Sequence, residues 1–532
     1  MTARGTSGVL HAMVVVSASS VTALGIGFVK NVLAAYYFGT SGPMDAYLLA
    51  LLLPDVAMQL ARTGAFNFIP LFAAEHRRSE DEAWRSASVM LGYWLAMLAG
   101  ALLAAFLLMP LALPLLAPGF DAERRRLTLE LARLLLLMAA SVGAGRILAV
   151  VLHAERRFLA AGAAEVAFQA GSTLFLVATH QMGIESLALA QVFGGLLQFV
   201  VVGLALLPRR HRLRPRFDFT SGPVRRLIRL SLPVYLGDTG DKVNVMVTRA
   251  FASLLPAGAV SGLQYAYTPV EGIHRMLAGP LTTAFFPFLS GRFAEADQRG
   301  ARLSLGRALV TVVLVFSPFA AATWLLADPL VVVLFERGSF DVASTRLTAS
   351  ALRLYAPAVL ALALNELVGS SFHARQDTLT PMRAGFLRVA GNAALCALLA
   401  PALGHRGLAL ATTLALYGKL AYLATSLRRV FTPPEARRHV AAVGRVLLAL
   451  GAMSAVVYPV AAFASTPAVL ATSPLLALCA LFLLCLSTYA AALWLLARRL
   501  FLVHTALLRR SVLRPLLRLR HPVGRAGTGG RA

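Results

Sequence analysis

Lysine is the charged residue that this sequence uses least. Only Lys30, Lys242 and Lys419 occur, and arginine supplies the rest of the 50 basic residues. Charged residues make up 14% of the chain and hydrophobic residues 58%, with a mean hydropathy of +0.72. A soluble protein carries about a quarter of its residues as charged side chains. The shortage of charge therefore excludes an ordinary soluble domain and predicts a multi-pass membrane protein.

Cysteine and the common catalytic motifs are also scarce. The three cysteines (Cys396, Cys479 and Cys485) lie in apolar runs without metal-ligand spacing, which excludes a disulfide framework and a metal site. The sequence contains no P-loop, HExxH or GxSxG motif and no cluster of histidine and cysteine. We therefore expect neither an enzyme nor a cofactor, and any movement of a substrate would use an ion gradient or the membrane potential.

Apolar runs recur along the whole chain, each of roughly 20 residues, which is the length that a helix needs to cross a bilayer. Their number predicts an all-α polytopic fold with about 14 transmembrane helices, arranged as two six-helix lobes plus two C-terminal helices. The predicted parts are a first lobe at 1–207, a basic cytoplasmic linker at 208–227, a second lobe at 228–428, two further helices at 429–500 and a basic cytoplasmic tail at 501–532.

The net charge of +26 is concentrated in alternate loops. Such a distribution is typical of cytoplasmic loops, so we attribute the charge to the positive-inside rule and expect no nucleic-acid partner. The Arg124-Arg125-Arg126 run breaks the alternation. The remaining loops predict that both termini are cytoplasmic.

Two of the three lysines lie at matching positions inside apolar segments. Lys30 follows Leu24-Gly25, and Lys242 follows Leu236-Gly237 with the same spacing. A second motif, at residues 65–72, recurs with partial similarity at residues 284–289. Six predicted helices separate the copies, so the halves would be parallel repeats with a substrate site between them near the bilayer midplane.

Polar residues of the first two helices in each half would line this cavity, because ionisable residues inside a membrane usually face one. The candidates for substrate binding are Lys30, Asn31, Asp45, Asp55, Arg62, Lys242, Arg249, Ser261, Glu271 and Arg275. Asp238, Asp241 and Glu366 are candidates for a structural or ion-coupling role.

The two lysines allow a functional and a structural interpretation. Either lysine could contact substrate phosphate as a compact point charge. Lys242 stands four residues after Asp238, so these two side chains could instead neutralise each other. Lys30 has no acid three or four residues away, and we expect its partners to be Asp45 or Asp55 of the next helix.

Several phrases resemble the MurJ (MviN) family of lipid II flippases, within the MATE-like exporter superfamily. The most specific are Leu334-Phe335-Glu336-Arg337-Gly338-Ser339-Phe340 and Phe372-His373-Ala374-Arg375-Gln376-Asp377 with Thr380-Pro381. Earlier ones are Phe38-Gly39, Asp45-Ala46-Tyr47, Leu53-Pro54, Gly64-Ala65-Phe66 and Ile69-Pro70. The resemblance implies two six-helix lobes in a V, and export of an undecaprenyl-pyrophosphate-linked precursor by alternating access.

The chain departs from that family at its cationic positions. The family's Arg-Asp in the first helix corresponds to Lys30-Asn31, and other arginines of the family fall on Met58, Gln59, Thr268 and near Leu24. Ser261 and Glu271 match the family pattern. The resemblance therefore implies the fold more strongly than the substrate.

We hypothesise a flippase for a polyprenyl-pyrophosphate-linked envelope precursor, most simply lipid II, in a bacterial inner membrane, with Lys30 and Lys242 on the pyrophosphate. The alternatives are a flippase for another lipid-linked oligosaccharide, such as O-antigen or exopolysaccharide units, a cation-coupled drug antiporter, and a non-transporting scaffold for envelope-synthesis proteins. The expected partners are the lipid-linked anionic substrate, the membrane, a coupling ion or the membrane potential, and cell-envelope synthesis proteins.

Overall fold

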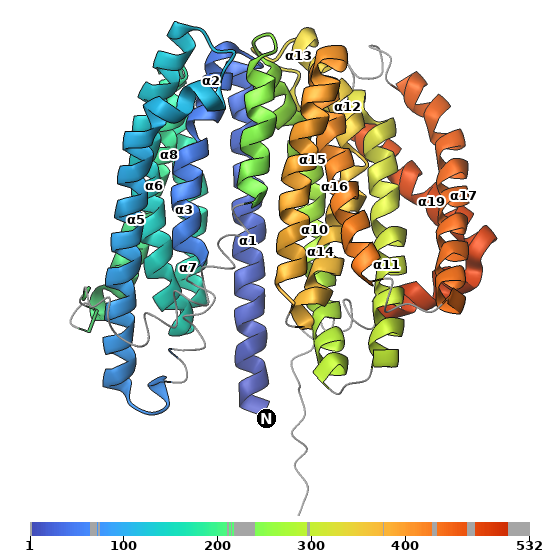
Figure 1. The fold of residues 1–532 in the computed structure, drawn as a ribbon, viewed down its shortest axis with the longest axis horizontal. Coiled ribbons are helices and arrows are strands. Elements are labelled where there is room, and N and C mark those ends of the chain that lie inside the picture. Colours follow the sequence, from blue (N-terminus) through green and yellow to red (C-terminus); the bar gives the residue numbers. More distant parts are fainter. Residues whose placement is uncertain are drawn as a thin grey trace, which may run out of the picture. The chain divides into compact units, whose positions relative to one another are not determined.

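The computed structural model describes residues 3–63, 72, 75–209, 212–213, 215–216, 240–294, 298–375, 377–427, 433–464 and 474–508. These residues form helices and short connections, and none of them belongs to a strand (Figure 1). The prediction of an all-α fold is confirmed.

The chain forms two compact units. The first consists of Met1–Gln264, Leu334–Thr348 and Val389–Ala411, and the second of Tyr265–Val333, Ala349–Arg388 and Thr412–Ala532. The lobe boundaries predicted from the sequence are derived from the order of the predicted spans along the chain. They stay a prediction.

The helices of the first part of the chain are α1 (Ala3–Phe38), α2 (Gly42–Ala50), α3 (Leu52–Thr63), α5 (Glu80–Leu116), α6 (Ala122–Ala154), α7 (Phe158–Thr179) and α8 (Glu185–Leu206), with short 3₁₀ turns at His180–Met182 and Leu207–Arg209. A helical segment then covers residues 240–253. The remaining helices are α10 (Ala259–Ala294), α11 (Gln298–Leu325), α12 (Ala327–Phe335), α13 (Val342–Tyr355), α14 (Ala358–Ala374), α15 (Leu379–Leu403), α16 (His405–Leu427), α17 (Pro433–Ala464) and α19 (Pro474–Leu508).

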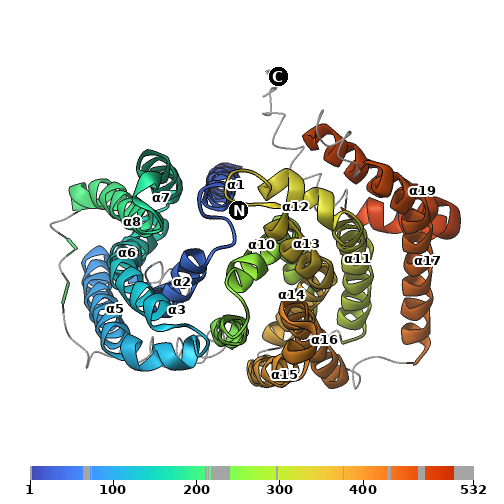
Figure 2. The same ribbon diagram turned by 90° about the horizontal axis from the view of Figure 1, so that it is seen from above.

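Helix α6 is central to the first unit. It packs against α8, α5, α3 and α2, which surround it when the helices are viewed end-on (Figure 2). The core between α5, α6 and α8 is apolar and includes Trp84, Met90, Ile147, Leu152 and Val202. Burial of such large side chains supplies the packing that holds helices together in a bilayer, where helices gain no hydrophobic free energy from leaving water.

Helix α1 packs closely against α7. A Cβ atom on Gly27 would lie 3.1 Å from the Gln169 Oε1 atom, and one on Gly162 would overlap the Ser19 hydroxyl. Small residues allow helix backbones to approach each other in membranes. This close approach brings the side chains of the next turn of α1, including Lys30, within reach of α7.

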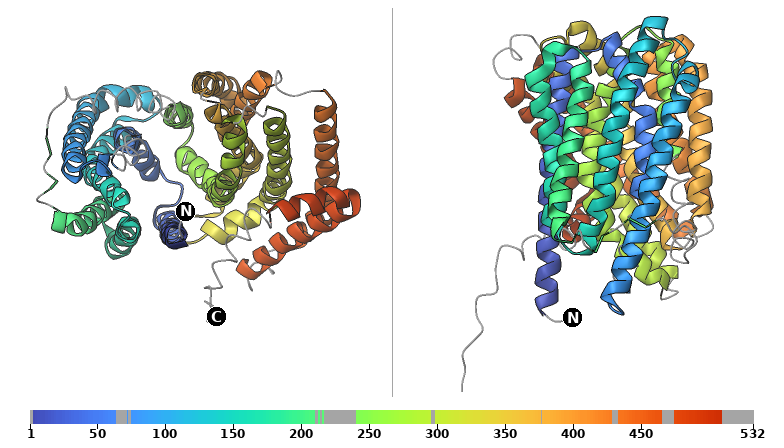
Figure 3. Two further views of the ribbon diagram at one scale, coloured as in Figure 1. Left: turned by 90° about the horizontal axis from the view of Figure 1, so that it is seen from below. Right: turned by 90° about the vertical axis from the view of Figure 1, so that its left-hand side faces the viewer.

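The core of the second unit lies between α11, α17 and α19. It includes Leu314, Met453 and Cys485, and the Tyr489 hydroxyl donates to the Leu314 carbonyl oxygen at 2.9 Å. The two C-terminal helices, α17 and α19, run side by side next to α11 (Figure 3).

Helices begin where the sequence supplies capping residues. The Ser41 hydroxyl accepts from the Met44 amide at the start of α2, and an Asp377 carboxylate oxygen accepts from the Thr380 amide at 3.0 Å at the start of α15. This backbone hydrogen bond holds the pKa of Asp377 below its usual value. Pro54 lies in the first turn of α3, where its missing amide hydrogen leaves no gap in the helix.

Two of the sequence motifs that resemble the MurJ family contact each other in the first unit. The Ser339 amide donates to the Tyr36 carbonyl at 2.8 Å, and the Ser339 hydroxyl donates to the Tyr37 carbonyl at 3.0 Å. Gly39 and Gly338 both have positive φ, of 56° and 61°, at this contact. A Cβ atom on Gly39 would overlap the Ser339 carbonyl oxygen, so glycine is required by both conformation and space.

Ten helices of the described residues are long and apolar enough to cross a membrane, or eleven if the bent pair Val342–Tyr355 and Ala358–Ala374 counts as one span. The predicted number of 14 is therefore not confirmed. Helices α2 and α3 are too short to be counted singly, because a turn at Leu51 separates them.

We predict that Gly39→Ala lowers the melting temperature of the purified protein in detergent. The positive φ alone costs a residue with a Cβ about 1–2 kcal/mol, and the overlap with Ser339 adds to it. Gly25→Ala is the matched control, because a Cβ at this α1 position meets nothing within 4 Å. Equal melting temperatures for the two variants would contradict this account.

Candidate functional site

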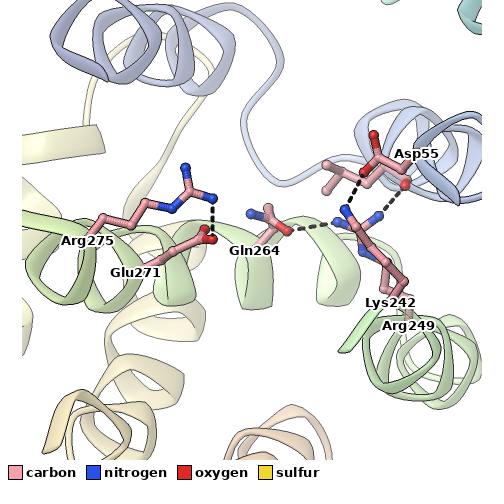
Figure 4. A network of polar contacts seen from close by, with 7 residues as sticks. Asp55, Lys242, Arg249, Gln264, Glu271 and Arg275 are labelled. Atoms are coloured by element: carbon pink, nitrogen blue, oxygen red, sulfur yellow. Dashed lines mark hydrogen bonds and ion pairs between the residues drawn. The ribbon is translucent and has the colours of Figure 1, made fainter. Parts of the chain in front are cut away.

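Lys242 and Arg249 form a cationic pair of side chains two turns apart on the helical segment 240–253. The Lys242 ammonium lies 3.3 Å from the Asp55 carboxylate, and each of these side chains is 37% exposed. Arg249 donates to the Leu48 carbonyl and, at 2.9 Å, to the Gln264 amide oxygen. Figure 4 shows Lys242 directed at Asp55 and Arg249 directed at Gln264.

The three side chains Lys242, Arg249 and Asp55 carry two positive charges and one negative charge, and all three are partly exposed. A half-exposed ion pair contributes little to stability. Its members can therefore exchange partners at low cost, which is what a reversible anion site requires.

Asp45 has a structural environment instead. Its side chain is buried, with a relative exposure of 2%, and accepts three hydrogen bonds of 2.7 Å. The donors are the Gly258 amide, the Ser261 amide and the Ser261 hydroxyl, all at the start of α10. A carboxylate is favoured there because it satisfies free amides and the positive end of the helix dipole. The predicted site residues Asp45 and Ser261 thus bind each other.

Lys30 does not have the acidic partners expected from the sequence. Its ammonium donates to Gln191 Oε1 at 3.0 Å, to Gln169 Oε1 at 3.1 Å and to the Ser172 hydroxyl at 3.3 Å. The expectation of Asp45 or Asp55 is wrong, since their ion-pair and hydrogen-bond partners are Ser261, Gly258 and Lys242. The sequence separation of Lys30 from α7 and α8 hid the actual acceptors.

The second unit contains one further ion pair and one contact between a histidine and a carboxylate among the predicted residues. Arg275 pairs with Glu271 at 2.7 Å, one turn apart on α10, and both side chains are about half exposed. The His274 ring pairs with Glu366 at 3.1 Å and joins α10 to α14. Glu271 thus has a local partner, whereas Glu366 connects two helices.

The other predicted residues are less informative. Asn31 is exposed on α1, and Asp241 is exposed in the first turn of the segment 240–253. Arg62 belongs to the last turn of α3, but its side chain lies outside the described residues. Asp238 lies outside the described residues altogether, so its pairing with Lys242 stays a prediction.

Sequence reasoning missed the neutral residues around Lys30. Gln169 and Ser172 of α7 and Gln191 of α8 were not selected because none of them is ionisable. A usable signal existed, since glutamine in an otherwise apolar span must find a hydrogen-bond partner there. A buried lysine elsewhere in the chain is such a partner.

The described residues form only helices and short connections, with ten or eleven candidate spans, which defines the class of multi-pass membrane proteins. The chain belongs to the family of lipid II flippases: the family model described as "Lipid II flippase MurJ" matches residues 34–479. The resemblance seen in the sequence is confirmed.

Similar proteins agree with this assignment. The "Probable lipid II flippase MurJ" of Rhizobium tropici is 31% identical over 409 residues, which cover 73% of this chain and 75% of that protein. The "Lipid II flippase MurJ" of Burkholderia cenocepacia is 26% identical over 468 residues, covering 83% and 89%.

Solved structures share the fold. A lipid II flippase MurJ in an inward closed conformation has a TM-score of 0.74 at 20% identity and covers 94% of this chain and 100% of that one. An inward-facing multidrug resistance MATE family transporter of the MOP superfamily has a TM-score of 0.60 at 14% identity, covering 80% and 95%. At these identities the likeness shows a shared fold, and the expected MATE-like fold is confirmed.

We predict that Asp45→Asn destabilises the protein by about 1–3 kcal/mol, because the amide cannot accept all three hydrogen bonds and its NH₂ group meets the helix amides. Thermal unfolding in detergent measures the loss. Asp81→Asn, on an exposed position of the first turn of α5, serves as the control and should change stability little. An unchanged melting temperature for Asp45→Asn would refute the capping role.

Proposed function

We propose that this protein moves a polyprenyl-pyrophosphate-linked cell-envelope precursor, lipid II in the first instance, across the bacterial inner membrane by alternating access. The names of the similar proteins from Rhizobium tropici and Burkholderia cenocepacia give lipid II as the substrate of those proteins. The protein acts as a transporter and not as an enzyme, and both termini lie in the cytoplasm.

The observation that carries this proposal is the partly exposed group of Lys242, Arg249 and Asp55. A pyrophosphate presents several anionic oxygens, and arginine and lysine are the side chains that bind them through charge-assisted hydrogen bonds. The Asp55 carboxylate lies 3.3 Å from the Lys242 ammonium and holds this side chain in place. An arriving pyrophosphate competes for Lys242 and for the Arg249 guanidinium, which donates to the Leu48 carbonyl and to the Gln264 amide oxygen.

Our sequence hypothesis gave the pyrophosphate to Lys30 and Lys242 together. The contacts favour Lys242 and Arg249, because an ammonium group has three hydrogen-bond donors and Lys30 has an acceptor for each of them. Lys30 is also buried, with a relative exposure of 6%. Substrate would have to displace protein acceptors to reach it.

A second candidate substrate is another lipid-linked oligosaccharide, such as an O-antigen or exopolysaccharide unit. It is favoured by Met58 and Gln59, which stand where the resembling family carries arginines and which are buried here at 8% and 6% exposure. The two candidates share the pyrophosphate and differ in the glycan. An ion gradient or the membrane potential drives either transport, and envelope-synthesis proteins supply and consume the substrate.

Complementation of a conditional lipid II flippase mutant tests the proposal. We expect the wild-type chain to restore growth, and Lys242→Ala and Arg249→Ala to fail, because each removes a charged contact worth about 1.5–3 kcal/mol, or roughly ten- to a hundredfold in transport. The single variant Lys30→Ala and the double variant Lys30→Ala/Lys242→Ala are tested in the same complementation assay. Arg126→Ala is the control, since Arg126 is 83% exposed at the start of α6.

Membrane expression of every variant is measured by immunoblot. Failure of the well-expressed wild-type chain would refute lipid II and lead to the same assay in a strain that lacks a flippase for another lipid-linked glycan. Full rescue by Lys242→Ala and Arg249→Ala would reject these residues as the site.

A further inference from the structure

Lys30 lies in a cage built from two other helices. Gln169 and Ser172 of α7 and Gln191 of α8 surround its ammonium with three oxygen acceptors at 3.0–3.3 Å. The Phe168 ring lies beneath it, with its centroid 5.1 Å from the Nζ atom. Three oxygens and an aromatic face are the elements with which proteins bind free ammonium ions.

The acceptors themselves are neutral. None of the ion pairs found among the described residues includes Lys30, and the acid that acts on it electrostatically is Glu165, one turn from Gln169 on α7. The Glu165 carboxylate is also an acceptor for the Gln198 amide at 3.3 Å. The cage therefore holds a positive charge by dipoles, a ring face and one carboxylate farther away, as a site for a monovalent cation does.

The cage is also held in place from outside. The Gln191 amide nitrogen donates to the Tyr47 hydroxyl at 3.0 Å, which directs the amide oxygen of Gln191 to Lys30. The Ser172 hydroxyl in turn donates to the Gln169 carbonyl of its own helix at 3.1 Å, which leaves its lone pairs for the ammonium. Gly27 keeps α1 close enough to α7 for Gln169 to reach.

We propose that Gln169, Ser172, Gln191 and Phe168 form a monovalent-cation site that the chain fills permanently with its own Lys30 ammonium group. The class of ligand is a primary ammonium ion. The ammonium group is covalently attached to α1 through the Lys30 side chain, so it cannot leave the site. It therefore holds α1, α7 and α8 together without an exchangeable cation. This role concerns the packing of one unit and goes beyond the proposed transport function.

The proposal predicts that an external ammonium ion can replace the missing side chain. Lys30→Ala removes three carbons and the ammonium group, which corresponds to n-propylammonium. We expect Lys30→Ala to lower the melting temperature of the purified full-length protein in detergent by several degrees, and n-propylammonium chloride to restore most of the loss. Tetramethylammonium chloride at the same concentration should not do so, because it has the charge but no N–H donor.

The controls separate a filled cage from a general salt effect. Wild-type protein, whose cage is occupied, should not respond to n-propylammonium. Lys242→Ala should not respond either, since the Lys242 ammonium lies beside the Asp55 carboxylate and both side chains are 37% exposed, so that water competes for the contact. Absence of restoration in Lys30→Ala, or equal restoration by tetramethylammonium, would overturn the proposal.

A second measurement decides the matter if Lys30→Ala cannot be purified. Lys30→Met keeps the unbranched side chain up to the position of Cε without the ammonium group, and Gln191→Leu removes one acceptor. If the cage and the ammonium act together, the double variant loses less stability than the sum of the two single variants, because each removes the same interaction. Additive losses would overturn the proposal. The readout is unfolding, so it is independent of whether lipid II is the transported substrate.

Discussion

A buried ion must find its hydrogen-bond partners within the protein, and a membrane makes this constraint stricter because it offers no water. The chain meets it in three ways. The buried Asp45 carboxylate is satisfied by backbone amides and a hydroxyl at the start of α10, Lys30 by neutral side-chain oxygens, and Lys242 by the opposite charge of Asp55. Each solution leaves the ion with a different freedom to change partners.

Fixed and exchangeable charges serve different ends. Asp45 and Lys30 are almost fully buried and have a partner for each strong donor or acceptor, so they hold helices in position. Lys242 and Arg249 are partly exposed, and their acceptors include the Asp55 carboxylate and the Gln264 amide oxygen. Our proposal assigns the anionic substrate to this second kind of charge, because its contacts can change without loss of a buried hydrogen-bond network. A binding site on such residues can release its ligand again, which transport requires.

The contact between the end of α1 and the segment around Ser339 belongs to the fixed part. Gly39 and Gly338 adopt positive φ there, and their missing side chains allow backbone to approach backbone. At this place, the motifs that carry the family resemblance therefore contribute residues that pack against each other.

Composition and hydropathy alone predicted an all-helical multi-pass protein, because a bilayer admits few ways to satisfy backbone groups. They did not determine the number of spans, since short helices such as α2 and α3 meet at turns that hydropathy does not mark. The predicted lobe boundaries and the duplication stay predictions.

The sequence by itself determined which few ionisable residues lie in apolar segments, and the matching spacing of Lys30 and Lys242 predicted equivalent roles. The tertiary structure decided otherwise, giving one lysine a neutral cage and the other an acidic partner. The physical reason is that partners are supplied by other helices: Gln191 lies 161 residues from Lys30, and Asp55 lies 187 residues from Lys242. The spacing of residues along the sequence determines where in an apolar segment a charge lies. The packing of the helices determines which side chains surround that charge.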